Sequence, residues 1–244
     1  MSPREADAVP EVVAAVPPVV LAVYAHPDDP EVACGGTLAR WAAAGSTVHL
    51  VIVCTGDKGT TEAGTDPAQL ALLRADEVAA GATALGVAGW EILGYPDGDV
   101  PDDTQLRERL VGANRRMTPT AVLCPDPTAA FFGRTYVNHR DHRVVGWAML
   151  DAVAPAAWSP LYFPSAGAPH RVGEVYLSGT LEPDCWVDIG ATLERKIDAL
   201  FCHASQLTET GDWFREFLRT SAEEAGAAAG VRYAEAFRKL ELGG

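Results

Sequence analysis

Residues 19–38 read VVLAVYAHPDDPEVACGGTL, and this stretch sets the expected fold. Its first six residues form an apolar run, and the run ends abruptly in a cluster of polar side chains, His26, Asp28, Asp29 and Glu31. A helical pattern follows this cluster. A strand, a short polar loop and a helix make the first half of a βα unit, and ligands bind where such strands end. An imidazole and two carboxylates this close together offer a divalent metal two ligands and leave one acid free.

Strands and helices alternate along the first part of the chain. The apolar pattern predicts strands at residues 19–24, 47–54, 90–93 and 120–124, and helices at residues 31–44, 67–85, 103–117 and 139–153. It further predicts strands at 172–177 and 186–189 and helices at 192–202, 213–229 and 231–240. The early alternation predicts the α/β class, as a Rossmann-like three-layer sandwich with a mostly parallel sheet and helices on both faces.

The two ends of the chain differ in their expected organisation. Residues 1–17 carry Pro3, Pro10 and Pro17 together with acidic residues, and we expect them to form a flexible N-terminal arm. No internal repeat and no long linker divides the remainder. We therefore expect residues 18–244 to form a single domain.

The composition excludes several classes of partner. A hydrophobic fraction of 48% is ample for a packed core, and a formal net charge of −14 argues against binding to nucleic acid or to an anionic membrane. The chain has no 18-residue apolar span, and its first residues make a poor signal peptide. Its five cysteines include no CxxC pair, which favours free thiols over disulfides. These features predict a cytoplasmic protein.

Two separate patches carry metal-binding side chains. The first is the His-Pro-Asp-Asp segment at residues 26–29, and the second is the Asn-His-Arg-Asp-His segment at residues 138–142. Each lies where a strand or loop leads into a helix, and such loops converge on the carboxyl edge of a parallel sheet. Adjacent aspartates are often only helix N-caps. Two histidine–aspartate patches at two strand ends favour a metal site instead. Two imidazoles and a carboxylate with an open fourth position suit catalytic zinc, and iron(II) or cobalt(II) also fit.

These patches resemble a known family. AHPDDPE at residues 25–31, CGGTL at 34–38 and HRDH at 139–142 resemble the LmbE-like, or PIG-L-type, zinc-dependent N-deacetylases. Shorter matching pieces are TGD at residues 55–57, RxxE at 74–77, PDG at 96–98, and a lysine and HxSQ segment at 196–206. The matching pieces therefore extend from about residue 20 to residue 206.

The resemblance implies a role for each matching residue. His26, Asp29 and His142 would bind the zinc ion, and Asp28 would be the general base that takes a proton from a metal-bound water. His139, protonated and oriented by Asp141, would stabilise the oxyanion that forms when an amide is attacked.

Two further residues have competing interpretations. By resemblance, Arg74 and Asp97 would bind the substrate. Arg74 equally suits a surface ion pair with Asp76 or Glu77 on its own helix. Asp97 lies in a Pro-Asp-Gly segment and also suits a simple turn.

The implied substrate is a small-molecule acetamido sugar, an N-acetylglucosamine-type sugar conjugated at its anomeric carbon. Three alternatives stay open at this point: an amidase that releases a larger acyl group from a glucosamine conjugate, a non-catalytic carbohydrate-binding protein, and a Rossmann nucleotide binder. The last requires a GxGxxG segment after the first strand, where this chain has HPDDPE. The sequence leaves open whether copies of the chain assemble into a homo-oligomer.

Overall fold

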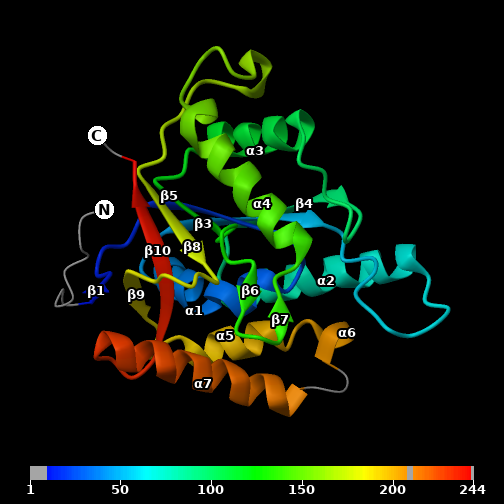
Figure 1. Cartoon of the computed structure of the whole chain (residues 1–244), viewed down its shortest axis with the longest axis vertical. Coiled ribbons are helices and arrows are strands. Elements are labelled where there is room, and N and C mark those ends of the chain that lie inside the picture. The colour runs from blue at the N-terminus through cyan, green and yellow to red at the C-terminus, as the bar shows by residue number, and fades with distance from the viewer. Residues whose placement is uncertain (1–9, 208–210, 243–244) are drawn as a thin grey trace.

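The apolar run at Val19–Tyr24 forms strand β2, and the sheet is built outward from it on both sides (Figure 1). The computed structural model describes residues 10–207 and 211–242. The strands are β1 (Glu11–Val12), β2 (Val19–Tyr24), β3 (Thr47–Cys54), β4 (Gly89–Tyr95), β5 (Ala121–Pro125), β6 (Phe131–Phe132), β7 (Tyr136–Val137), β8 (Glu174–Ser178), β9 (Cys185–Asp188) and β10 (Ala234–Glu241). The helices are α1 (Asp29–Ala43), α2 (Pro67–Leu85), α3 (Thr104–Met117), α4 (Arg140–Asp151), η1 (Ala152–Ala157), η2 (Pro164–Ala166), α5 (Leu193–Leu200), α6 (Ala204–Leu207) and α7 (Gly211–Ala229).

The main sheet is mostly parallel, as predicted. Its strand order is β1-β9-β10-β8-β5-β2-β3-β4, and β8, β5, β2, β3 and β4 pair in parallel. β10 is antiparallel to both of its neighbours, β8 and β9. β6 and β7 form a separate antiparallel hairpin between β5 and α4.

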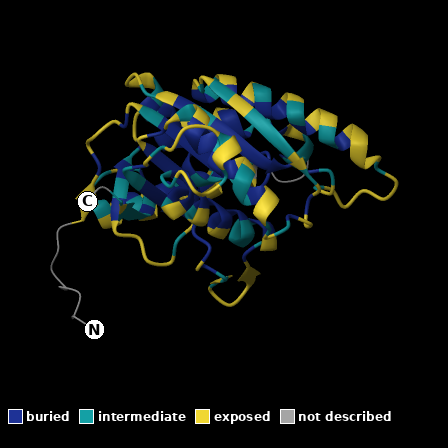
Figure 2. Cartoon of the chain, turned by 90° about the horizontal axis from the view of Figure 1, so that it is seen from above, coloured by how far each residue is buried: buried dark blue, intermediate teal, exposed yellow. Residues whose placement is uncertain are grey.

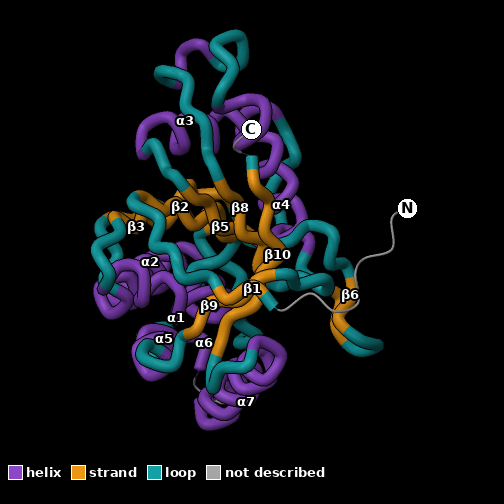
Figure 3. Tube along the Cα trace, turned by 90° about the vertical axis from the view of Figure 1, so that its left-hand side faces the viewer, coloured by secondary structure: helices purple, strands orange, loops and turns teal. Residues whose placement is uncertain are grey.

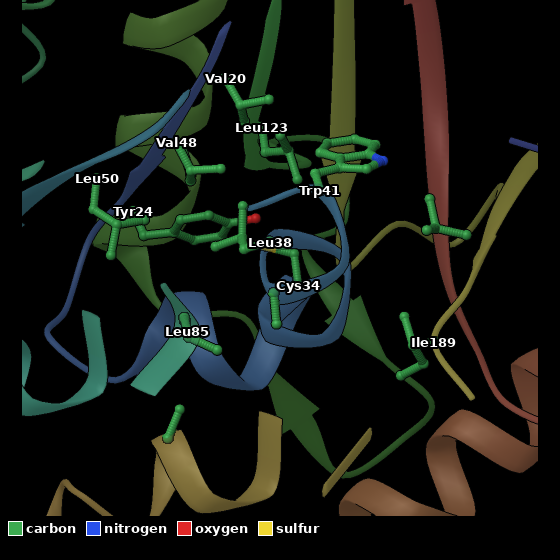
Figure 4. Close-up of a cluster of buried hydrophobic side chains, with 14 of the residues drawn as sticks. Val20, Tyr24, Cys34, Leu38, Trp41, Val48, Leu50, Leu85, Leu123 and Ile189 are labelled. Carbon is green, nitrogen blue, oxygen red and sulfur yellow. The ribbon is translucent and has the colours of Figure 1, made fainter. Parts of the chain in front are cut away.

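Helices cover both faces of this sheet. Alternate residues of β2 point to opposite faces, so Val20, Ala22 and Tyr24 belong to one buried cluster and Leu21 and Val23 to the other. The first cluster is completed by α1, α2, α5 and α7, and the second by α3, α4 and η1 (Figures 1 and 3). Figure 4 shows part of the first cluster, in which side chains of α1 lie beside those of the sheet. The buried residues are concentrated in the strands, and the exposed ones on loops and outer helix faces (Figure 2). The predicted three-layer sandwich is therefore confirmed.

The prediction of a helix at residues 231–240 is wrong, because this segment contains the strand β10. Its Ala, Glu, Lys and Leu residues favour a helix intrinsically, by less than about 1 kcal/mol each. In the strand, Phe237 is fully buried between the sheet and its helices, and the backbone pairs with two strands at once. Gly230, with φ of +70°, ends α7 and lets the chain turn back into the sheet. Pairing with distant strands thus overrides a weak local preference.

The expected N-terminal arm also needs correction over the part that the structure describes. Residues 11 and 12 form β1 and pair in parallel with Cys185 and Trp186 of β9. Val13 is buried, and its backbone N–H donates to the carbonyl of Trp186 at 2.7 Å. Residues 1–9 lie outside the described residues. Pairing with β9 therefore holds a segment whose prolines and acidic residues suggested a flexible arm.

Both sequence patches lie at the point where the strand order reverses. The chain passes from β2 to β3 and β4 on one side, and then returns to β5 on the other side of β2. His26 follows β2, and α4 begins at Arg140 after β5. Ligands bind at such switch points in α/β sheets. None of the helices in the described residues is long and apolar enough to cross a membrane.

Candidate active site

The loop after β2 presents its two aspartates in different ways. Asp28 occupies the N-cap position of α1, but its side chain makes no capping hydrogen bond. Asp29 folds back on the loop, and its Oδ2 accepts a hydrogen bond from the backbone N–H of His26 at 2.7 Å. Simple helix capping therefore does not explain the Asp-Asp pair.

The first turn of α4 brings His142 to this loop. His142 Nε2 lies 3.1 Å from His26 Nδ1 and 3.1 Å from Asp29 Oδ1. His26 Nδ1 is also 3.3 Å from Asp29 Oδ2. One ligand atom from each of these three residues lies within 4.8 Å of the other two. The convergence expected from the sequence is therefore present, across 116 positions of the chain.

The electrostatics of this group fit a cation. Burial opposes protonation of His26, but the charge of Asp29 and hydrogen bonds with Asp141 and Asp97 outweigh it and raise the pKa of His26 to about 12. Burial opposes ionisation of Asp29, but the neighbouring imidazoles of His142 and His26 still hold the pKa of this carboxyl well below its usual value. Two imidazole nitrogens that face each other at 3.1 Å need a shared proton or a metal ion between them. The donor set fits a divalent metal such as zinc.

Asn138 orients one of these donors and was not given a role from the sequence. Its Oδ1 accepts a hydrogen bond from His142 Nδ1 at 2.9 Å, which leaves Nε2, the nitrogen that lies next to Asp29, as the one that can bind a metal ion. The Asn138 side chain in turn donates to the carbonyl of Ala129 at 2.7 Å. Metal-binding histidines commonly have such a partner on the second nitrogen. The sequence signal for this role was the position of Asn138 directly before His139, within the segment that carries His142.

Asp97 and Asp141 lie on the other side of the His26 ring. His26 Nε2 is 3.3 Å from Asp97 Oδ1 and 3.7 Å from Asp141 Oδ2. Asp141 is fully buried and accepts from the backbone N–H of Gly98 at 2.7 Å. Burial opposes its ionisation, but the nearby His26 ring and the hydrogen bond from Gly98 lower the pKa of Asp141 to about 2. Both carboxylates therefore hold the His26 ring, and Asp97 also lies in the expected turn.

His139 differs from its expected state. It is the N-cap residue of α4, and its Nδ1 accepts a hydrogen bond from the backbone N–H of Asp141 at 3.2 Å. The carboxylate of Asp141 is farther away, at 3.9 Å. Burial and the charge of His26 lower the pKa of His139. An accepting Nδ1 carries no proton, so the structure holds a neutral imidazole that Asp141 orients through its backbone rather than its carboxylate.

Arg74 contacts Asp28 instead of a neighbour on its own helix. Its Nη2 lies 2.8 Å from Asp28 Oδ1, and Nη1 donates to the carbonyl of Gly56 at 3.3 Å. The expected alternative pair with Asp76 or Glu77 is wrong, because Glu77 accepts from the backbone and hydroxyl of Ser205. Gly56 has φ of +69°, and a Cβ at this position would lie 2.7 Å from Arg74 Cζ. The arginine side chain is 3% exposed, whereas that of Asp28 is 27% exposed and open to a substrate.

A second buried pair lies beneath the loop. Glu31 Oε2 is 3.4 Å from His203 Nε2, and both side chains are excluded from solvent. Burial raises the pKa of Glu31. Burial opposes protonation of His203, but Glu31 raises its pKa overall. The pair joins α1 to the segment after α5 and does not reach the metal-binding atoms.

Comparison with known proteins agrees with this geometry. The chain is 34% identical over 224 residues to a diacetylchitobiose deacetylase of Thermococcus kodakarensis, covering 90% of this chain and 82% of that protein. It is 28% identical over 247 residues to a 1D-myo-inositol 2-acetamido-2-deoxy-alpha-D-glucopyranoside deacetylase of Rhodococcus jostii, covering 78% of this chain and 82% of that protein. Its structure is similar to that of the N,N'-diacetylchitobiose deacetylase from Pyrococcus horikoshii in complex with an inhibitor. That match has a TM-score of 0.85 and 30% identity, and it covers 92% of this chain and 84% of the other.

A family profile matches the part of the chain that carries these residues. The profile is that of PIG-L, described as GlcNAc-PI de-N-acetylase, and the match extends over residues 21–153, more than half of the chain. This range begins in β2, ends beyond α4 and includes both metal-binding patches. The profile match and the similarity to these relatives show that the chain belongs to the PIG-L, or LmbE-like, family, and the converging histidines and aspartates agree with this.

Proposed function

We propose that this protein is a metal-dependent hydrolase that removes the acetyl group from the nitrogen of an N-acetylglucosamine-type sugar conjugate. One observation carries the proposal: His26 Nδ1, an Asp29 carboxylate oxygen and His142 Nε2 face a common point, next to the partly exposed carboxylate of Asp28. The similarity to enzymes named as deacetylases of acetamido sugars supports the same reaction.

His26, Asp29 and His142 would hold the metal. Two imidazole nitrogens and one carboxylate suit zinc, which we propose as the metal, and iron(II) or cobalt(II) also fit these donors. When bound, such an ion acts as a Lewis acid that makes a water molecule acidic near neutral pH and polarises an amide carbonyl. Asn138, Asp97 and Asp141 fix the two imidazole rings in the orientation that this requires.

Asp28 is the general base in this proposal. Arg74 binds its Oδ1, which leaves Oδ2 available to take a proton from the attacking water. Arg74 is therefore proposed to orient the base, and its contact with sugar hydroxyls stays a prediction from the family resemblance, as does that of Asp97.

His139 is proposed to stabilise the oxyanion by a hydrogen bond from its ring, and the proton that Asp28 takes from the water is proposed to pass to the leaving amine. Because its Nδ1 accepts a hydrogen bond from the helix backbone, its Nε2 carries the proton in the neutral ring. The side chain is 41% exposed, and its ring centroid lies 4.6 Å from that of His26. A donor beside the metal-binding group, open to solvent, is placed to meet charge that develops on the substrate.

The substrate that we propose to test first is N,N'-diacetylchitobiose. The relative named for this sugar is more similar to the chain than the relative named for an inositol conjugate, at 34% against 28% identity. A glucosamine-conjugate amidase that releases a larger acyl group is the alternative within the same chemistry.

The main sheet contains both β2 and β10, so we also propose that residues 18–244 act as one domain.

An acetate-release assay tests the proposal. The zinc-loaded protein is expected to release acetate from N,N'-diacetylchitobiose or from an N-acetylglucosamine–inositol conjugate. Asp28→Asn should lower turnover about 10²–10⁴-fold with unchanged metal content, since it removes the base but no ligand. Asp99→Asn is the matched control, because the side chain of Asp99 is exposed and pairs with Lys58. Full activity of Asp28→Asn would disprove the base assignment. If no acetate is released from these sugars but a larger acid is released from a glucosamine conjugate that carries it, the result would favour the amidase.

A further inference from the structure

Helix α1 is interrupted just after the residues of the site. Cys34 has φ of −150° and ψ of 16°, which is not helical, so a first turn at residues 29–33 is separated from the rest of the helix. In a continuous α-helix, the N–H of Gly36 would donate to the carbonyl of Val32. The break leaves these two groups, and the next N–H at Thr37, without their helical partners.

A buried ion pair supplies the missing partners. Lys196 Nζ donates to the carbonyl of Val32 at 2.9 Å, and the two carboxylate oxygens of Glu235 accept from Gly36 N at 3.0 Å and Thr37 N at 2.7 Å. Lys196 and Glu235 also pair with each other at 2.5 Å, and their side chains are 5% and 4% exposed. Lys196 thus gives a partner to the carbonyl before the break, and Glu235 gives partners to the N–H groups after it.

The signs of these charges suit the positions they occupy. Glu235 lies at the N-terminus of the second part of α1, where backbone N–H groups and the helix dipole favour an anion. Lys196 lies at the carbonyl end of the first turn, where a cation is favoured. Because this region is buried, no water can take over these backbone groups if the pair is lost.

The double glycine of the sequence gives the pair its access to α1. A Cβ at Gly36 would lie 2.8 Å from Ile189 Cδ1, and one at Gly35 would lie 3.2 Å from Lys196 Cγ. Thr192 Oγ1 donates to the carbonyl of Gly36 at 2.8 Å on the same side. Figure 4 shows Cys34 and Ile189 in this part of the core. The Cys-Gly-Gly-Thr segment is therefore a packing requirement of the break.

We infer that Lys196 and Glu235 are positioning residues for the active site. The second part of α1 is fixed in the core through Leu38 and Trp41, whereas the first turn carries Asp29 and follows Asp28. The angle at the break decides whether these aspartates reach His142, and the ion pair is the contact that spans the break. This inference rests on the proposed function, because it takes Asp29 and His142 as metal ligands.

Metal binding by variants of the pair tests the inference. Glu235→Gln keeps the size of the side chain but offers only one acceptor to two N–H groups. It is expected to weaken zinc binding at least tenfold in a chelator competition at 20 °C and to change the d–d absorption spectrum of the cobalt(II)-loaded protein. Lys196→Arg keeps the charge and should recover part of the zinc affinity that Lys196→Met loses.

Arg115→Lys is the matched control for a general loss of stability. Arg115 is buried and donates to backbone carbonyls of residues 156–167, far from α1. Both Arg115→Lys and Glu235→Gln should lower the Tm, by on the order of 5–10 °C. Only Glu235→Gln should change zinc affinity and the cobalt spectrum, and Arg115→Lys should keep zinc affinity within twofold.

The outcomes separate the two proposals. If the wild-type protein binds zinc but folded Glu235→Gln binds it equally well with the same cobalt spectrum, the positioning role is disproved and the proposed function stands. If the wild-type protein binds neither metal, the proposed function fails and the inference falls with it. If Glu235→Gln does not fold, the double variant Lys196→Met/Glu235→Gln removes both buried charges, and the same zinc criterion is applied to it.

Discussion

Two groups of buried charges lie on either side of the first turn of α1, and they are built differently. The strand-end cluster consists of His26, Asp29, Asp97, His139, Asp141 and His142, with three carboxylates around three imidazoles. The Lys196–Glu235 pair has one charge of each sign, and its oxygen and nitrogen atoms bind backbone groups of α1. Charges that balance and bind the backbone hold the fold together. The negative charge of the three carboxylates, which raises the pKa of His26 to about 12, creates a place for a cation.

The largest expected effect comes from removing a donor of the strand-end cluster. His142→Ala should weaken zinc binding by more than 100-fold and abolish acetate release, because an outer contact to a metal ligand already contributes 10–100-fold. Equilibrium dialysis with metal analysis measures the loss. His170→Ala is the control, since His170 contacts the carbonyl of Pro119 away from the site. If His142→Ala kept the zinc affinity of the wild-type protein, the strand-end cluster would not be the metal site that distinguishes it from the Lys196–Glu235 pair.

His139→Ala should separate metal binding from catalysis within the cluster. We expect turnover to fall about 10²–10³-fold, which is the usual result of removing one oxyanion donor, with zinc affinity close to that of the wild-type protein. Steady-state acetate release and metal content are measured on the same preparation. A zinc-free variant would instead place His139 among the ligands.

Asn138→Ala should have an intermediate effect. The substitution leaves His142 Nδ1 without the acceptor that orients its ring, so zinc affinity should fall about 10–100-fold. Chelator competition gives the affinity, and excess zinc should restore turnover. Loss of turnover that zinc does not restore would show that Asn138 acts on the reaction by another route.

The pH dependence of the Tm of the metal-free protein should show the effect of the carboxylates around His26. The folded-state pKa of His26 is raised from 6.5 to about 12, so its stabilising contribution is complete below pH 6.5 and is lost as the pH rises towards 12. The Tm of the metal-free protein should therefore fall by several degrees between pH 6 and pH 9, and by less with saturating zinc, which replaces the proton. In His26→Gln this difference should vanish. An equal decline with and without zinc would contradict the explanation.

The smallest effect is expected from an exposed ion pair. Glu194 and Arg219 join α5 to α7 at 2.6 Å, and their side chains are 61% and 34% exposed. Glu194→Gln should change the Tm by about 2 °C or less, because water and salt screen such pairs. Thermal unfolding beside Glu235→Gln makes the comparison direct. A shift as large as that of the buried variant would show that burial does not distinguish these pairs.

The part of the fold around β2 could be predicted because its signals are local. The apolar runs of β2, β3 and β5 are buried on both faces, as strands of a parallel sheet must be, and α2 covers the expected residues 67–85. Of the residues proposed to bind the metal, His26 and Asp29 come directly after β2, and His142 lies in the first turn of α4, which follows β5 after the β6–β7 hairpin. Once a parallel sheet is assumed, their convergence follows from its geometry.

Other features depend on contacts between distant segments and have no local signal. The helix expected at residues 231–240 is the strand β10, because β8 and β9 are both available for pairing. Arg74 binds Asp28 across 46 positions rather than a neighbour on α2. Glu235 reaches Gly36 and Thr37 across nearly 200 positions. The periodicity of a segment indicates which of its residues share a face, and it contains no information about partners in distant segments.

The amino-acid sequence by itself determined the class of fold and the family, and it predicted which residues could bind a metal, because apolar periodicity and closely spaced ligands are properties of short segments. The tertiary structure alone decided the strand β10, the partner of Arg74, the neutral form of His139 and the ion pair at the break in α1. These depend on which buried groups become neighbours, and burial fixes their charges and hydrogen bonds only after the chain has folded.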